Sequence, residues 1–321
     1  MGLGGISQAM TEILTAISKD DTECLVKHIE CLQGSPDADF IQSILEEALQ
    51  KAVSSASIEI VKVLLDHMPN SVDFQNMCVG TPAAVLAAEA GRADVLGLLL
   101  DKGCPPCVTD LAKRTPLHWS CMQGHLDVTR LLVEQGASVN HPDQLSGYTP
   151  LSLASRQGHE STVKFLLKHG ARTDVSDRYG ETALHEAVRN GQVGCARALL
   201  KGGARVDAAD LLGRTPAVVA VQWKRSSALA LLIHWNCDID VAAMPMYRPH
   251  EYANGRQPQL ERRLLDIAIC ERELEMAEML LSAGARTDIL EKVLLHMQVL
   301  HFDDETLNNM TKWVILRKNV F

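Results

Sequence analysis

A short pattern that begins with threonine returns every 33 or 34 residues through the middle of the chain. Its four copies read TPLH, TPLS, TALH and TPAV, and they start at Thr115, Thr149, Thr182 and Thr215. After the first three starts, a glycine follows at nine residues and a Gly-Ala pair at twenty-one. Because three markers keep one spacing, the pattern predicts a row of similar units that pack on their neighbours.

Each marker has a local structural reason. A threonine hydroxyl can accept a hydrogen bond from an N–H at a helix start, and proline at the first helical position loses no donor that the helix needs. Gly124 can take a positive φ without a Cβ penalty, which turns the chain sharply into a second helix. The apolar stripe of that helix holds Val128, Leu131 and Leu132, and Gly136 ends it. Each unit is therefore predicted to be two helices joined by a turn.

These motifs resemble those of the ankyrin-repeat family, whose units carry T-P-L-H-x-A at this period. The resemblance is strongest between residues 81 and 204. It implies an all-α ankyrin-repeat solenoid of stacked helix-turn-helix units with short loop fingers. In that family the histidine of the motif is structural, so the resemblance implies that the rings of His118 and His185 hydrogen-bond to loop backbone.

The array is predicted to continue with weaker copies on both sides of the strong motifs. The repeat that begins at Thr215 is eroded, because Lys224 and Asn236 stand where glycines are expected. An insertion of roughly fifteen residues, rich in Pro, Tyr, Met and Arg, follows it and is predicted to form an enlarged loop. The predicted organisation is a helical cap or degenerate repeat at 1–44, the array at 45–240, the inserted loop at 241–258, a further repeat at 259–288 and a helical cap at 289–321.

Composition limits the classes of partner. A formal net charge of −9 disfavours a general attraction to nucleic acid or to an anionic membrane, because long-range phosphate binding starts from an excess of Lys and Arg. The sequence holds no run of about 18 apolar residues for a membrane span, and its start lacks a signal-peptide pattern. Nine scattered cysteines are typical of a reducing compartment. We therefore expect a folded protein of the cytoplasm or nucleus.

Cys104 and Cys107 form the one arrangement that suggests chemistry. A C-x-x-C pair can exchange thiols or supply half of a zinc site. The pair follows the end of a second helix, where the helix dipole would raise a thiol pKa, and Cys78 and His118 are the only plausible further ligands. No catalytic arrangement of nucleophile, base and acid recurs, and no phosphate-binding glycine pattern is present. We expect no enzyme activity, catalytic residue, cofactor or metal, with a metal- or thiol-dependent function of this pair as an alternative.

Partners of the ankyrin family are usually held by the loop fingers and by the exposed side of each first helix. The register places ten candidate partner-binding residues in these slots: Arg114, Met122, Tyr148, Arg156, Arg178, Tyr179, Arg189, Leu211, Arg214 and Trp223. Interface hot spots are enriched in arginine and aromatic side chains, because these side chains cover large areas and arginine binds carboxylate or phosphate through two hydrogen bonds.

The arginine and aromatic residues in these slots predict that the chain is a protein-protein interaction module that binds an acidic or phosphorylated protein segment. Its role is expected to be that of a scaffold, adaptor or substrate receptor in a signalling or ubiquitin-ligase assembly. Nucleic-acid binding through the same arginine-rich groove is a further alternative, disfavoured by the net charge and by the absence of a recognition helix.

Overall fold

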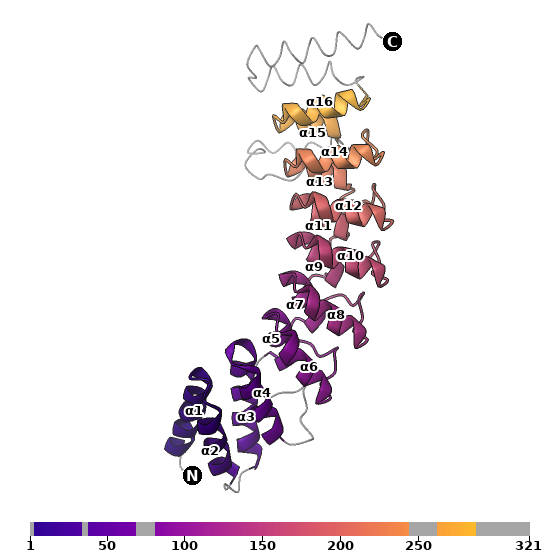
Figure 1. Cartoon of the computed structure of the whole chain (residues 1–321). Helices are drawn as coiled ribbons and strands as arrows, with labels where there is room; N and C mark the ends of the chain where they lie inside the picture. Colours follow the sequence, from indigo (N-terminus) through magenta and orange to yellow (C-terminus); the bar gives the residue numbers. More distant parts are fainter. Residues whose placement is uncertain (1–2, 34–37, 69–80, 244–261, 287–321) are drawn as a thin grey trace. The chain divides into compact units, whose positions relative to one another are not determined.

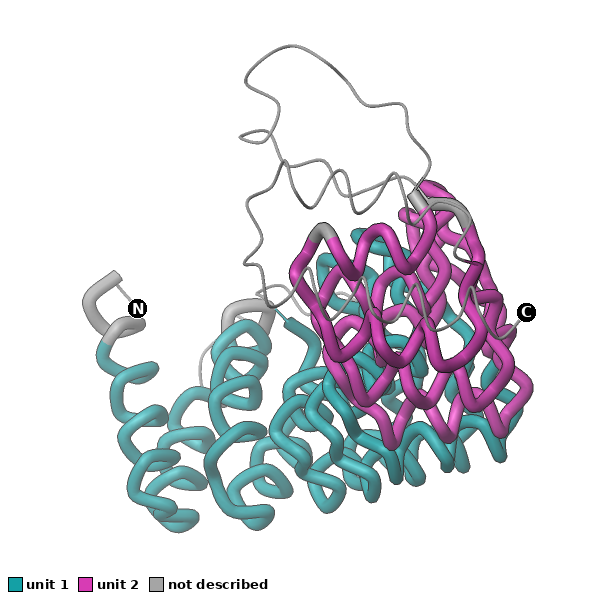
Figure 2. Tube along the Cα trace, turned by 90° about the horizontal axis from the view of Figure 1, so that it is seen from above, with its two compact units in different colours: residues 1–172 teal, residues 173–321 magenta. Residues whose placement is uncertain are grey.

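The computed structural model describes residues 3–33, 38–68, 81–243 and 262–286. Paired short helices follow one another along the chain (Figure 1), which divides into two compact units, residues 1–172 and 173–321 (Figure 2). The predicted C-terminal cap at 289–321 lies outside the described residues. So does most of the predicted inserted loop at 241–258.

The described part of the first unit holds five helix pairs. First helices contact the first helices of neighbouring pairs, and second helices contact second helices, so the pairs stack in sequence order. The third helix spans residue 44, where the predicted cap meets the array. The helices are α1 (Leu3–Ser18), α2 (Thr22–Gln33), α3 (Ala38–Ser55), α4 (Ile58–His67), α5 (Ala83–Glu89), α6 (Ala93–Asp101), α7 (Pro116–Gln123), α8 (Leu126–Glu134), α9 (Pro150–Gln157) and α10 (Glu160–Lys168).

The second unit holds three described pairs with the same stacking pattern. They are α11 (Ala183–Arg189) with α12 (Val193–Lys201), α13 (Pro216–Gln222) with α14 (Ser226–His234), and α15 (Leu264–Cys270) with α16 (Leu274–Ser282). Two short strands, β1 (Ala242–Ala243) and β2 (Arg262–Arg263), pair antiparallel between the second and third of these. The predicted all-α fold of stacked helix pairs is confirmed.

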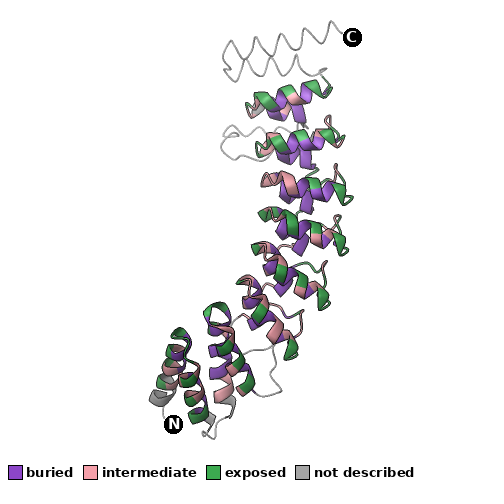
Figure 3. Cartoon of the chain, viewed as in Figure 1, coloured by how far each residue is buried: buried purple, intermediate pink, exposed green. Residues whose placement is uncertain are grey.

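Burial follows the stacking (Figure 3). From α5 onward the first helices are short and mostly buried, as in α13, where residues 216–221 are all buried. The second helices bury one stripe, and in α8 that stripe includes Val128 and Leu132. A first helix is packed by its own second helix and by a neighbour on each side, so it has little surface left for polar residues.

The first helices of the four motif copies begin at the threonines, but the predicted hydroxyl cap is clear at Thr149, whose Oγ1 accepts the Ser152 N–H at 3.2 Å. In the two copies with histidine, the ring caps the threonine N–H. The Thr115 N–H donates to His118 Nδ1 at 3.1 Å, and the Thr182 N–H donates to His185 Nδ1 at the same distance. His185 Nε2 lies 3.0 Å from the carbonyl oxygen of Arg214 in the following loop. One ring therefore caps its own helix and holds the next loop, which is the structural role that the resemblance implied for His185.

Gly124 meets two requirements at the turn between α7 and α8. Its φ is +80°, in the left-handed region that favours glycine. A Cβ there would lie 2.4 Å from Nδ1 of His159, whose ring packs against the turn and whose Nε2 lies 3.0 Å from the Met122 carbonyl oxygen. In the eroded repeat, Lys224 takes the equivalent conformation at φ +56° without being glycine.

A pair of alanine substitutions separates these two requirements. Gly136 has a φ of +83° but no atom within 4 Å of the place that a Cβ would take, so Gly136→Ala should cost only the backbone strain of about 1–2 kcal/mol. Gly124→Ala should cost a further ~1–3 kcal/mol, because His159 must also move. Urea unfolding of both variants measures the difference, and equal losses would show that the ring yields freely.

The buried motif histidines should make stability depend on pH. Burial lowers the pKa of His118 to about 4 and also lowers the pKa of His185. Both titrate near pH ~6.5 once unfolded, so the unfolded chain binds more protons than the folded chain below that pH. Stability should therefore be complete above pH ~6.5 and fall toward pH ~4, by at most about 1.4 kcal/mol per pH unit for each histidine.

Unfolding free energies measured at several pH values test this dependence. The double variant His118→Gln, His185→Gln should flatten the slope, whereas a variant of the exposed His169, His169→Gln, should keep it. An unchanged slope in the double variant would assign the acid sensitivity to other groups.

Candidate functional site

Four buried or half-buried aspartates shape the loops that precede the first helices. These loops, here called the fingers, are residues 110–114, 143–148, 177–181 and 210–214. In each finger, Oδ1 of the first residue accepts at least two backbone N–H groups of the same loop, at distances between 2.8 and 3.3 Å. The aspartates are Asp110, Asp143, Asp177 and Asp210. Their spacing of 33 or 34 residues is a sequence signal for the finger turns in addition to the threonine motif.

Neighbouring fingers are tied by backbone hydrogen bonds within each unit. In the first unit the Gln144 N–H donates to the Ala112 carbonyl at 3.0 Å. In the second unit the Leu211 N–H donates to the Tyr179 carbonyl at the same distance. The backbone polar groups at these points are satisfied inside the protein, so the tips can present side chains to solvent without local unfolding.

Large apolar side chains collect at the finger tips and at one first-helix end. The described residues include seven exposed large hydrophobic side chains, and six lie in the slots that the repeat register assigns to partner binding. The six are Leu111 (98% exposed), Leu145 (59%), Tyr179 (65%), Leu211 (76%), Leu212 (61%) and Trp223 (41%). The seventh, Leu274, begins a second helix. The six therefore occupy finger or first-helix-end positions of their repeats within each unit, and exposed apolar side chains gathered in this way are typical of interaction sites.

The predicted arginines of the first unit contact aromatic rings. Arg114 donates from Nε to Asp143 Oδ2 at 3.1 Å, and its guanidinium carbon lies 5.6 Å from the centre of the Trp119 ring. Arg156 is exposed and lies 5.6 Å above the ring of Tyr148. Arg114 thus uses part of its charge in joining two fingers, while Arg156 and Tyr148 form a stacked pair at the surface.

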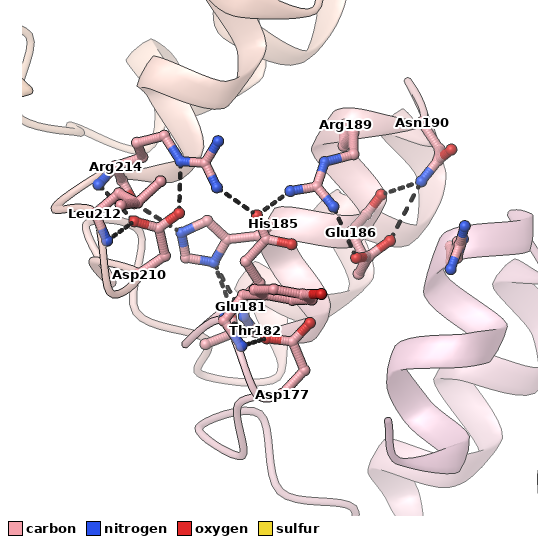
Figure 4. A network of polar contacts seen from close by, with 12 residues as sticks. Asp177, Glu181, Thr182, His185, Glu186, Arg189, Asn190, Asp210, Leu212 and Arg214 are labelled. Atoms are coloured by element: carbon pink, nitrogen blue, oxygen red, sulfur yellow. Dashed lines mark hydrogen bonds and ion pairs between the residues drawn. The ribbon is translucent and has the colours of Figure 1, made fainter. Parts of the chain in front are cut away.

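In the second unit, Glu181 is the centre of an ion-pair network (Figure 4). Both Arg189 Nη2 and Arg214 Nη2 bind its Oε1, the latter at 2.9 Å. Arg214 also binds Asp210 at 2.6 Å, and Arg189 binds Glu186 at 3.0 Å. The network therefore joins two successive fingers to the end of helix α11.

The network reduces the positive charge that Arg189 and Arg214, two predicted binding residues, can present to a partner. The guanidinium of Arg189 lies 5.8 Å from the ring centre of Trp223, so the network also supports this exposed ring. Arg214 is buried, with 7% of its surface exposed. Its charge cannot meet a partner unless two internal ion pairs break, which is costly for buried groups.

The ten predicted binding residues thus fall into three groups by exposure, and their partner contacts remain a prediction. Arg214 is buried. Arg114, Met122, Tyr148 and Arg189 are half-buried, and Arg156, Arg178, Tyr179, Leu211 and Trp223 are exposed. Leu111, Leu145 and Leu212 occupy the same finger slots and join the candidate surface because of their exposure.

Potential metal ligands crowd together at one place in the described part of the chain. Within the described residues, Asp177, Glu181 and Glu186 are the only three that place ligand atoms within 4.8 Å of one another. Burial raises the pKa of Asp177, and the arginines already bind the two glutamates. The cluster is therefore explained by the ion-pair network.

The C-x-x-C pair lacks the features of a reactive thiol pair. Cys104 is buried, and burial raises the pKa of its thiol to about 12, while Cys107 is exposed. A high thiol pKa leaves little of the reactive thiolate at neutral pH.

None of the described helices is both long and apolar enough to span a membrane.

Comparison with known proteins gives one consistent family. A model of ankyrin repeats in three copies matches residues 13–110, 86–177 and 171–243. An ankyrin repeat-containing protein of Schizosaccharomyces pombe is 38% identical over 68 residues, which are 21% of this chain and 33% of that protein. The ankyrin repeat protein YahD of Escherichia coli is 33% identical over 146 residues, which are 40% of this chain and 73% of YahD. The match thus spans a third of the first relative and most of the second.

Removal of the charge at the centre of the network should destabilise the second unit. Glu181→Gln keeps the side-chain size but leaves two guanidiniums without their shared carboxylate, and we expect it to lower the unfolding free energy by about 3 kcal/mol. Glu59→Gln is the matched control, because Glu59 forms an exposed pair with Lys62 at 3.2 Å and should cost under about 0.5 kcal/mol. Chemical denaturation measures both, and losses of similar size would refute a stabilising network.

Proposed function

The chain belongs to the ankyrin-repeat family, and we propose that it binds a partner protein across its finger tips. Ankyrin repeats form protein-binding modules. Our proposal concerns which surface of this chain contacts the partner. The supporting observation is that six of the seven exposed large hydrophobic side chains lie at the fingers and the end of α13. Burying such side chains against a partner contributes roughly 1.5–3 kcal/mol each at most, so a few of them can dominate affinity.

The surface chemistry favours a partner segment that combines apolar and acidic residues. All finger carboxylates are buried or half-buried, whereas the charged residues exposed at the tips are the cations Lys113 and Arg178. The finger tips are therefore apolar and locally positive on a chain of net charge −9. The predicted acidic or phosphorylated segment fits this surface, with apolar side chains supplying most of the buried area and acidic groups setting orientation.

The alternatives have less support from the described residues. Arg114, Arg189 and Arg214 bind carboxylates of the protein itself, which leaves fewer arginines for nucleic-acid phosphates. The buried Cys104 gives a thiol function little support. We further propose that the chain acts as a scaffold, adaptor or substrate receptor in a signalling or ubiquitin-ligase assembly of the cytoplasm or nucleus. Identification of the partner tests this role.

Substitution of the exposed finger residues should remove the partner without unfolding the protein. The double variant Tyr179→Ser, Leu211→Ser should weaken binding at least about tenfold, because the loss of two anchors is expected to exceed about 1.4 kcal/mol. Affinity purification with mass spectrometry would identify proteins retained by the wild type and lost by this variant. Binding would then be measured with the purified partner.

Leu274→Ser is the matched control, because Leu274 is exposed but begins the second helix α16 and belongs to none of the four fingers. It should retain the partner. A partner that binds the finger variant as tightly as the wild type would exclude this surface. Arg178→Glu tests the acidic component separately, since it should weaken binding more at low salt than at high salt. Retention of the partner after nuclease treatment would exclude a nucleic-acid bridge.

A further inference from the structure

The N-terminal helix pair, away from the fingers, carries side chains of the types that can bind a metal ion. His28 on α2 and Glu12 on α1 face each other, with His28 Nδ1 at 3.3 Å from Glu12 Oε2. Cys24 precedes His28 by four residues on α2, so the two side chains lie on one face of the helix, one turn apart. Cysteine, histidine and glutamate are the residue types that bind zinc in proteins.

A cavity of about 200 Å³ brings these three residues together. Its lining includes Glu12, Cys24 and His28, with Thr11, Thr15, Ala16, Lys19 and Asp21. His28 and Glu12 retain 31% and 41% of their side-chain exposure, so an ion can reach them from solvent. Among these residues the only fixed cation is Lys19, whose long side chain can turn toward water.

The His28–Glu12 separation matches one edge of a zinc coordination sphere. With zinc bonds of about 2.0–2.1 Å and tetrahedral angles, a nitrogen and an oxygen ligand lie roughly 3.3–3.4 Å apart. We propose that Glu12 Oε2, His28 Nδ1 and Cys24 Sγ form a binding site for a zinc-type divalent ion between α1 and α2. His28 Nδ1 binds the ion through its lone pair, in place of any proton directed at Glu12, and a water from the open cavity supplies the fourth ligand.

One adjustment completes the site. The three ligand atoms do not all lie within 4.8 Å of one another. Cys24 is a free thiol of intermediate exposure on α2, and rotation about χ1 moves its sulfur between the two staggered positions that a helix favours. Metal binding releases the thiol proton, so the closed site contains a thiolate, a neutral imidazole and a carboxylate.

The surroundings of Glu12 support a ligand role. Gln8 donates from Nε2 to Glu12 Oε1 at 3.0 Å, which leaves Oε2 directed at His28. Such second contacts hold a ligating carboxylate in position and tune metal affinity. No linear motif predicted this set, because its carboxylate comes from a different helix than the Cys-His pair.

Bound metal would join α1 to α2 at the N-terminal end of the first unit. This pair contacts other helix pairs through α3 and α4 on one side of the stack. A cross-link there would stabilise the terminal helices without any change at the fingers. The inference is independent of the proposed partner surface.

Cobalt titration of the full-length reduced protein tests the site. We expect one Co²⁺ per chain with a thiolate-to-metal absorption band, displacement of Co²⁺ by Zn²⁺, and a higher thermal midpoint with Zn²⁺. Cys24→Ser and His28→Gln should each weaken binding by about 100-fold or more and abolish or reduce the band. Gln8→Ala should weaken it by about tenfold.

Two cysteine variants serve as controls. Cys31→Ser changes an exposed cysteine on the same helix, and Cys107→Ser changes the exposed member of the C-x-x-C pair. Both should bind the metal as the wild type does. Loss of binding in either control, wild-type affinity in Cys24→Ser, or a cobalt spectrum without the thiolate band would overturn the proposal. Circular dichroism checks that each variant keeps its helices.

Discussion

A single helix pair of this protein cannot bury its own apolar surface. Inner first helices such as α13 are apolar on nearly every side and need a neighbouring pair on each side to exclude water. This constraint explains the strict spacing of the sequence, because equivalent residues must meet equivalent residues in the next pair. It also explains why side chains cross between repeats, as His185 does when it binds the carbonyl of Arg214.

The fingers follow from the same constraint. The loop between repeats must pass over the stack, and its aspartate binds the loop's own N–H groups, so the turn keeps its shape without external support. Backbone groups and charges are satisfied inward, and apolar side chains such as Leu211 are left outward. Apolar side chains that face water on otherwise satisfied loops are the observation that supports the proposed partner surface.

Two arginines that the repeat register places on the exposed binding face form ion pairs inside the protein. Arg189 and Arg214 occupy slots of the expected binding face, yet both bind Glu181 and stiffen the scaffold. The positive charge predicted for the surface is thus partly internal, and the apolar tips become its main feature. Glu181, which binds both arginines, occupies the same position in its repeat as Arg214 does in the next, one residue before the motif threonine, so a count of arginines alone overestimates the available charge.

The sequence by itself determined the repeat unit, the helix starts and turns, the family and the positions of the finger tips. Threonine caps, positive-φ glycines such as Gly124 and apolar stripes act over a few residues, so their consequences can be predicted from local order. Only the tertiary structure decided which side chains meet across repeats and helices. The pairing of Glu181 with two arginines and the approach of Glu12 to His28 join residues on different elements, and their separation depends on side-chain packing that no linear spacing specifies.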